Sequence, residues 1–210
     1  MPEGALVLNV YSRIAPLPAG LDELRRRRNG QLGRDHLWLL KSDAAEVLSR
    51  LKQAKEADAP EALSRRLCRY HLTDNVRGES DLWEPENVRK RTFTMSTLAE
   101  TQTSVTVRLV GAFAMLISGI KVEGRNKRSE MGLEGTLEGV LEIDKAKGTF
   151  TGAKLYASAT GWGASTFTPD EPPGRFPVKF AMVVASDAVS REVAPQGVMH
   201  SGRDEYTAPK

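Results

Sequence analysis

The stretch 105–116 reads VTVRLVGAFAML and alternates in character from one residue to the next. One set of alternate positions is apolar apart from a glycine at 111, and comprises Val105, Val107, Leu109, Phe113 and Met115. The other set begins with the polar Thr106 and Arg108 and becomes apolar from Val110 onward. A period of two is typical of a β-strand, whose side chains point alternately to opposite faces of a sheet. The second set therefore predicts a strand that is covered on both faces only toward its end.

Runs with the same period lie on both sides of this stretch. Residues 93–97 precede it, residues 176–184 come last, and residues 133–143 and 149–159 flank the short loop DKAKG at 144–148. A short loop ending in glycine between two alternating runs predicts a hairpin, because glycine tolerates the positive φ that such turns need. Frequent glycines within these runs predict strong curvature. The chain after about residue 92 is therefore expected to form a curved antiparallel β-meander.

The chain before residue 92 follows other patterns. Residues 5–11 (ALVLNVY) are short and apolar and predict one further strand, and residues 21–28 predict a brief helix. Residues 43–57 and 61–70 carry apolar side chains at spacings of three and four, which predicts two longer helices. Ser42 is the expected N-cap of the first. The expected fold class is α+β, with about five strands in the meander plus the N-terminal strand, packed by two helices.

Length and composition favour a single domain. The chain has 210 residues, 40% of them hydrophobic, which fits one α+β domain over residues 1–190. Residues 1–91 would supply the first strand and the helices, and residues 92–186 the meander. The polar segment 191–210 is expected to be a flexible tail.

The charge pattern argues against a nucleic-acid binder. The formal net charge is only +3, and acidic residues interleave with the basic clusters at 25–28, 65–66, 89–91 and 125–128. No apolar run is long enough to span a bilayer, and the first residues lack the features of a leader peptide. We therefore expect a soluble protein, either cytoplasmic or exported with its leader removed. Cys68 is the single cysteine; it is either a half-buried helix residue or a thiol activated by neighbouring arginines.

Two segments concentrate groups that can carry chemistry: GRDHLW at 33–38 and YHLTDNVRGE at 70–79. Each contains a histidine with an acid nearby, and an imidazole oriented by a carboxylate is common to general-base and metal chemistry. If the segments meet, the candidate catalytic or metal-binding residues are His36, His71, Asp35, Asp74 and Glu79. A structural interpretation is the alternative: Asp35 and Asp74 would cap turns, and Arg34 and Arg77 would pair with carboxylates.

These two segments resemble those of a group of bacterial proteins that carry Gly-Arg-Asp-His/Phe-Leu-Trp and His-Leu-x-Asp-Asn-x-Arg-Gly-Glu before a β-rich half. The resemblance covers much of the chain and implies one continuous domain. It implies no activity, no cofactor and no catalytic residue.

The leading functional hypothesis is a non-enzymatic binding or structural module, because no complete catalytic motif is present. An unidentified small ligand or protein would lie in a cleft between sheet and helices. The candidate ligand-binding residues are Arg34, Trp38, Arg77, Trp83 and Trp162. The alternative is a metal-dependent or acid–base hydrolase that uses His36 and His71 with the nearby carboxylates. No cofactor and no firm metal site is implied, and edge strands offer a route to oligomers.

Overall fold

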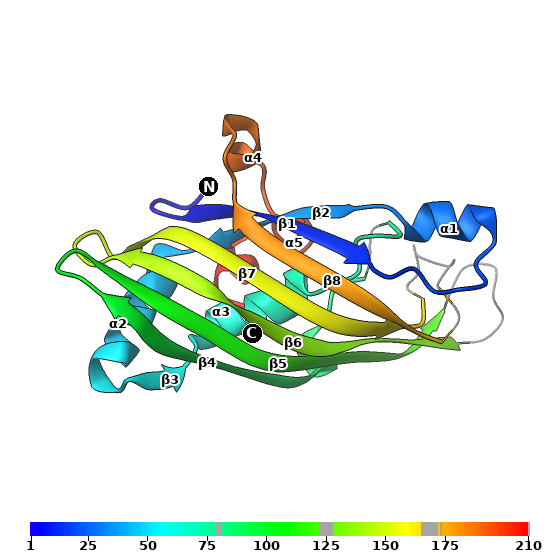
Figure 1. Ribbon diagram of the computed structural model, residues 1–210, viewed down its shortest axis with the longest axis horizontal. Helices are drawn as coiled ribbons and strands as arrows, with labels where there is room; N and C mark the ends of the chain where they lie inside the picture. The colour runs from blue at the N-terminus through cyan, green and yellow to red at the C-terminus, as the bar shows by residue number, and fades with distance from the viewer. Residues whose placement is uncertain (79–80, 122–127, 165–171, 173, 210) are drawn as a thin grey trace.

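An antiparallel sheet dominates the computed structural model, which describes residues 1–78, 81–121, 128–164, 172 and 174–209. Within these residues the strands are β1 (Leu6–Ile14), β2 (Gly33–Leu39), β3 (Glu56–Asp58), β4 (Val88–Glu100), β5 (Ser104–Lys121), β6 (Arg128–Asp144), β7 (Thr149–Trp162) and β8 (Arg175–Val184). Their order across the sheet is β2-β1-β8-β7-β6-β5-β4-β3. Figure 1 shows long strands that twist and bend together, with β2 and β3 as the two edges.

The expected strand content was wrong. The described residues form one eight-stranded antiparallel sheet rather than a meander of about five strands plus an N-terminal strand, although the class is still mixed α+β. The two missed strands, β2 and β3, lie in the first half of the chain. In β2, charged side chains at Arg34 and Asp35 hide the alternation. In β3 only three residues pair with β4, where the sequence predicted the end of a helix.

Helices cover one face of the sheet. These are α2 (Lys41–Gln53), α3 (Glu61–Arg66) and the π-helical turn η1 (Leu67–His71) (Figure 1). Val47 of α2 and Leu63 of α3 are fully buried in the same apolar core as Leu109 of β5. The first helix begins at Lys41, earlier than expected, and Leu40 rather than Ser42 occupies the N-cap position. The carboxylate of Asp43, three residues later, accepts the backbone N–H of Leu40 at 2.9 Å.

Short helices occupy other positions: α1 (Glu23–Asn29) joins β1 to β2, and η2 (Pro85–Asn87) precedes β4. None of the helices in the described ranges combines the length and the apolar character that crossing a bilayer requires.

The hairpin between β6 and β7 is confirmed. Asp144 pairs with Thr149 across its turn, and Gly148 has the positive φ, +62°, that the sequence predicted. Glycine also permits close approach within the sheet, because a Cβ at Gly139 would lie 2.4 Å from the carbonyl oxygen of Lys154 on β7. The turn chemistry thus fixes a local pairing between strands that are neighbours in the chain.

The C-terminal segment is folded against the body of the protein, in contrast to the flexible tail expected over residues 191–210. It forms α5 (Gln196–Ser201) and α6 (Arg203–Thr207), after α4 (Ala188–Glu192). Tyr206 is fully buried and joins Trp38 and Tyr70 in a second apolar cluster beside β2. The segment is polar overall, but this one aromatic side chain, an ion pair between Arg69 and Glu205, and hydrogen bonds from Arg66 to backbone carbonyls anchor it.

Candidate functional site

A buried chain of three side chains links the edge strand β2, the turn η1 and the C-terminal helix α6. His71 Nδ1 lies 2.9 Å from Asp35 Oδ2, and His71 Nε2 lies 2.8 Å from the hydroxyl of Tyr206. The other oxygen of Asp35 accepts the backbone N–H of Gln196 at 2.8 Å. His71 and Tyr206 are fully buried, and Asp35 is 6% exposed. The segments 33–38 and 70–79 therefore meet at Asp35 and His71.

The hydrogen-bond partners indicate which atoms of this chain donate and which accept. Asp35 can only accept in its ionised form, so Nδ1 of His71 carries a hydrogen. The Tyr206 hydroxyl accepts the backbone N–H of Trp38 at 3.2 Å and can donate its own hydrogen to Nε2 of His71. Burial raises the pKa of Tyr206 well above its ordinary value, so the hydroxyl keeps that hydrogen. Donation from Nδ1 of His71 to Asp35 and from the Tyr206 hydroxyl to Nε2 gives every polar atom of this chain a partner.

Local geometry puts these groups in reach of each other. Side chains alternate between the two faces along β2, so Leu37 and Leu39 enter the main core and Trp38 joins the second cluster. Asp35 shares the face of Leu37, and η1 packs on that face. The wider turn of η1 ends at His71. Gly33 lets the following loop approach, because a Cβ there would lie 2.5 Å from the carbonyl oxygen of Asn75.

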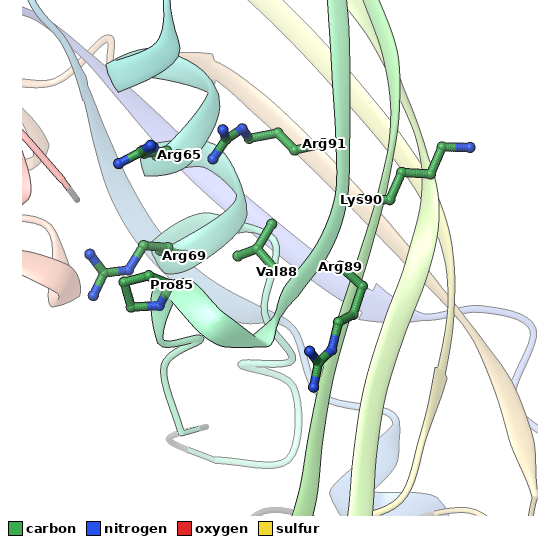
Figure 2. A pocket seen from close by; sticks show the side chains of 7 residues that line it. All are labelled: Arg65, Arg69, Pro85, Val88, Arg89, Lys90 and Arg91. Atoms are coloured by element: carbon green, nitrogen blue, oxygen red, sulfur yellow. The ribbon is translucent and has the colours of Figure 1, made fainter.

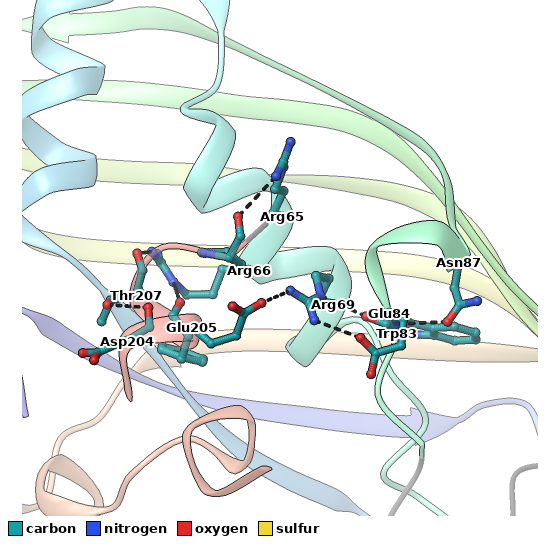
Figure 3. Close-up of polar contacts among 11 residues, drawn as sticks. Arg65, Arg66, Arg69, Trp83, Glu84, Asn87, Asp204, Glu205 and Thr207 are labelled. Atoms are coloured by element: carbon teal, nitrogen blue, oxygen red, sulfur yellow. Dashed lines mark hydrogen bonds and ion pairs between the residues drawn. The ribbon is translucent and has the colours of Figure 1, made fainter. Parts of the chain in front are cut away.

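Two arginines hold the C-terminal segment in place, as Figure 3 shows. Arg66 is fully buried; its Nη1 donates to Asp43 at 2.7 Å and its Nε to the carbonyl oxygen of Tyr206 at 3.1 Å. Arg69 donates to Glu205 at 2.6 Å and to the carbonyl oxygen of Trp83 at 3.1 Å. Burial raises the pKa of Asp43, and the nearby Arg66 opposes that rise. These contacts fix the backbone that carries Tyr206.

A cleft of about 620 Å³ opens beside this chain. Three parts of the molecule line it: β2, the loop after His71, and the C-terminal segment. The lining residues are Arg34, Asp35, His36, Asn75, Gly78, Val193, Ala194, Gln196, Met199 and His200. Its volume is in the range of small-ligand sites, and its lining mixes charged, amide and aliphatic groups. Asp35 is shared between the cleft and the buried chain.

The cleft borders an unpaired stretch of the β2 edge. The carbonyl oxygen of Val7 accepts the backbone N–H of Ala185, which follows β8, so the backbone groups of Val7 point away from β2. The alternate residues of β1, Leu8 and Val10, therefore form the hydrogen-bonded pairs with Leu37 and Asp35. The even-numbered residues of β2 therefore direct their backbone groups outward. Outward N–H groups at Trp38 and Leu40 donate to Tyr206 and Asp43. Those of Arg34 and His36 meet no acceptor within the described residues.

The other predicted site residues divide into two groups. His36 and Arg34 line the cleft, although His36 and Asp35 point to opposite faces of β2. Asp74 does not join them: its carboxylate accepts the backbone N–H of Val76 and pairs with Arg77 at 2.7 Å. Arg77 also donates to the carbonyl of Gly163. For Asp74 and Arg77 the structural interpretation is the one that fits, while Glu79 lies outside the described residues.

The aromatic candidates and the cysteine lie outside the cleft lining. Trp83 is 1% exposed, and its indole N–H donates to the carbonyl of Leu72 at 2.9 Å. Trp162 ends β7, donates to Glu130 and stacks against Arg175, whose guanidinium carbon is 4.2 Å from the ring centroid. Cys68 is fully buried rather than half-buried, and burial raises the pKa of its thiol to about 12. An activated thiol does not fit this environment.

The residues that sequence reasoning missed are Tyr206 and Gln196, together with the buried pair Asp43 and Arg66. The first two lie in the segment taken for a flexible tail. One signal was available: arginines at 66 and 69 interrupt the apolar stripe of the helix, and an arginine at such a position needs a buried partner. Nothing in the sequence pointed to which partner it would find.

No group of three or more metal-ligating side chains occurs among the described residues. No family model matches the chain, and neither a curated protein nor a solved structure matches it. The chemistry of the cleft therefore has to be inferred from its own residues.

Proposed function

We propose that this protein is a binding module that holds a short, extended, acidic peptide segment against the edge of β2. The observation that carries the proposal is the unpaired edge itself, at Arg34 and His36, inside a cleft large enough for a ligand. A strand added to a sheet edge gains affinity from main-chain hydrogen bonds and specificity from alternate side chains. The two outward residues offer two N–H donors and two carbonyl acceptors.

The two ends of the unpaired stretch of β2 limit the length of the bound peptide. Tyr206 occupies the outward N–H of Trp38, so pairing ends there. Upstream, β2 begins at Gly33. About four residues of peptide span this stretch at 3.3–3.4 Å per residue. Such a small contact implies weak binding, with a dissociation constant in the range of roughly micromolar to millimolar.

The acidic preference follows from Arg34. Its side chain is exposed at the cleft, and within the described residues it makes no ion pair or hydrogen bond. Both oxygens of Asp35, the acidic side chain in the lining, are already hydrogen-bonded, to His71 and to Gln196. A carboxylate on the peptide would therefore find an arginine available for a bidentate pair. Val193 and Met199 offer apolar contact to its neighbouring side chains.

The hydrolase alternative draws less support from this geometry. A general base needs a lone pair directed at the substrate, but both ring nitrogens of His71 are engaged with protein groups. His36 faces the cleft without an orienting carboxylate among its hydrogen-bond partners in the described residues. The Asp35–His71–Tyr206 chain therefore acts, in this proposal, to position β2 and the C-terminal segment on either side of the ligand.

Titration with two blocked tetrapeptides tests the proposal. They would differ only in having aspartate or asparagine at one position, and binding would be followed by the backbone amide shifts of Arg34 and His36. We expect the aspartate peptide to shift both amides and to bind about tenfold more tightly, as one charged hydrogen-bonded contact is worth about 1.5–3 kcal/mol. Equal binding of the two peptides would remove the acidic preference, and unshifted β2 amides would refute the proposal.

Matched variants separate backbone from charge recognition. His36→Pro removes an N–H that the sheet does not use, so the fold should persist while peptide binding is lost. Arg34→Ala should weaken the aspartate peptide and leave the asparagine peptide unchanged. Arg13→Ala removes an exposed arginine of β1 that does not line the cleft, and it should change neither.

A further inference from the structure

A second pocket, of about 310 Å³, lies where α3 and η1 face the start of β4. Five cationic side chains line it, together with Pro85 and Val88: Arg65, Arg69, Arg89, Lys90 and Arg91. Figure 2 shows Arg91 reaching from β4 toward the helix that carries Arg65, while Lys90 points away from it. Arginines from three different elements thus line one hollow.

Ion pairs with carboxylates hold three of these arginines in place. Glu61 holds two of them: one carboxylate oxygen accepts from Arg65 Nε at 2.7 Å and also from Arg91 Nη2. Although partial burial alone would raise it, the pKa of Glu61 is lowered by Arg65 and Arg91. Arg69 is fixed by Glu205 and Glu84, with its side chain 5% exposed. Even without Lys90, four arginines against three contacting carboxylates leave the pocket cationic.

Donors remain available in this hollow. Among the described residues, Arg65 Nη2 and Arg91 Nε and Nη1 donate to no protein acceptor, and the Arg89 guanidinium has no partner. Arg89 owes its placement to a β-bulge, since the pairing of β4 with β5 passes from Val88 to Lys90 and skips it. Bulges re-aim side chains, and they are frequent near binding sites. Planar guanidinium groups bind phosphate oxygens in bidentate pairs.

From this convergence we infer a second ligand site, for the phosphate group of a small phosphate monoester. The dianion would lie beside the Glu61 carboxylate that bridges Arg65 and Arg91, and it would accept from the donors of these two arginines that Glu61 leaves unused, with Arg89 at the rim. Pro85 and Val88 form an apolar shelf on which the organic part of the monoester can rest. The hollow is small, about 310 Å³, which suits a compact ligand better than a continuous polyanion that needs an extended basic track.

Calorimetric titration of the intact protein with inorganic phosphate and with phenyl phosphate tests this site at low ionic strength. We expect phosphate to bind weakly and phenyl phosphate more tightly, because the ring gains apolar contact. Arg91→Gln should weaken both ligands at least tenfold, since it removes a charged donor pair. Lys90→Ala, the matched control on the next residue of the strand, should change both by less than about twofold.

Three results would overturn the inference. One is the absence of phosphate binding by the folded protein at roughly 10 mM ligand, a concentration at which even millimolar affinity would be detected. Another is equal weakening by Lys90→Ala and Arg91→Gln, which would indicate a diffuse surface potential. The third is tight retention of a single-stranded oligonucleotide that is insensitive to Arg91→Gln, which would indicate a polyanion surface instead. Thermal unfolding of each variant shows whether it is folded before titration.

Discussion

At the scale of single residues, the hydroxyl of Tyr206 joins parts of the chain that are far apart in sequence. It accepts the N–H of Trp38 and contacts His71, which is in turn held by Asp35. Because all of these groups are buried, each bond that is lost leaves a polar atom without water. The hydroxyl therefore couples the position of the C-terminal segment to that of the β2 edge.

Tyr206→Phe should destabilise the protein by about 1–3 kcal/mol, the cost of leaving buried partners unsatisfied. The ring and its packing against Trp38 and Tyr70 are kept, so the loss reports on the hydroxyl alone. Chemical denaturation of both proteins measures the change. Tyr156→Phe is the control, because Tyr156 is 45% exposed, and its stability should match the wild type. An unchanged free energy of unfolding for Tyr206→Phe would contradict the assigned hydrogen bonds.

Cys68 gives a prediction about pH. Burial raises the pKa of the folded thiol to about 12, above the unfolded value near 8.5, so the folded state resists ionisation. Stability from this group is complete below about pH 8.5 and falls as the pH rises toward 12. At pH 8, a thiol reagent should therefore react with the native protein only as fast as the core opens. Rapid labelling of the native protein, compared with a sample in denaturant, would show that the thiol is accessible.

At the scale of elements, α5 depends on a glycine. A Cβ at Gly197 would lie 2.7 Å from the ring of Tyr70, so no larger residue fits without moving the helix. Gly197→Ala should cost about 1–3 kcal/mol by overpacking and should weaken peptide binding in the cleft. Met199→Ala on the same helix removes a side chain that is 79% exposed, and stability should not change. Equal stability of the two variants would mean that α5 is not packed as described.

Prediction from sequence succeeded where one local rule controls an element. The β6–β7 hairpin follows from alternation and Gly148, and the core positions of β5 follow from period two. It failed where pairing is decided by distant partners. Strand β3 forms through its pairing with β4. In β2, the charged Arg34 and Asp35 lie at a sheet edge that borders a cleft. No local pattern in residues 33–39 indicates that this segment is an edge strand beside a cleft.

At the scale of the whole molecule, the same distinction applies to the candidate site. The meeting of Asp35 with His71 could be anticipated, because both segments carry complementary groups. The partners Tyr206 and Gln196 could not, since they follow the last strand and depend on how the sheet curves to bring its edge to them. A single domain over 1–190 stays a prediction, and the residues beyond 190 contribute to the cleft.

The central claim is that the β2 edge is unpaired at two residues and closed at the next. Amide hydrogen exchange along β2 of the native protein tests it most directly, without any ligand. We predict slow exchange at Asp35 and Leu37, which pair with β1, fast exchange at Arg34 and His36, and protection of Trp38 that is lost in Tyr206→Phe. Slow exchange at Arg34 and His36 would mean that this edge is already occupied, and it would contradict the account.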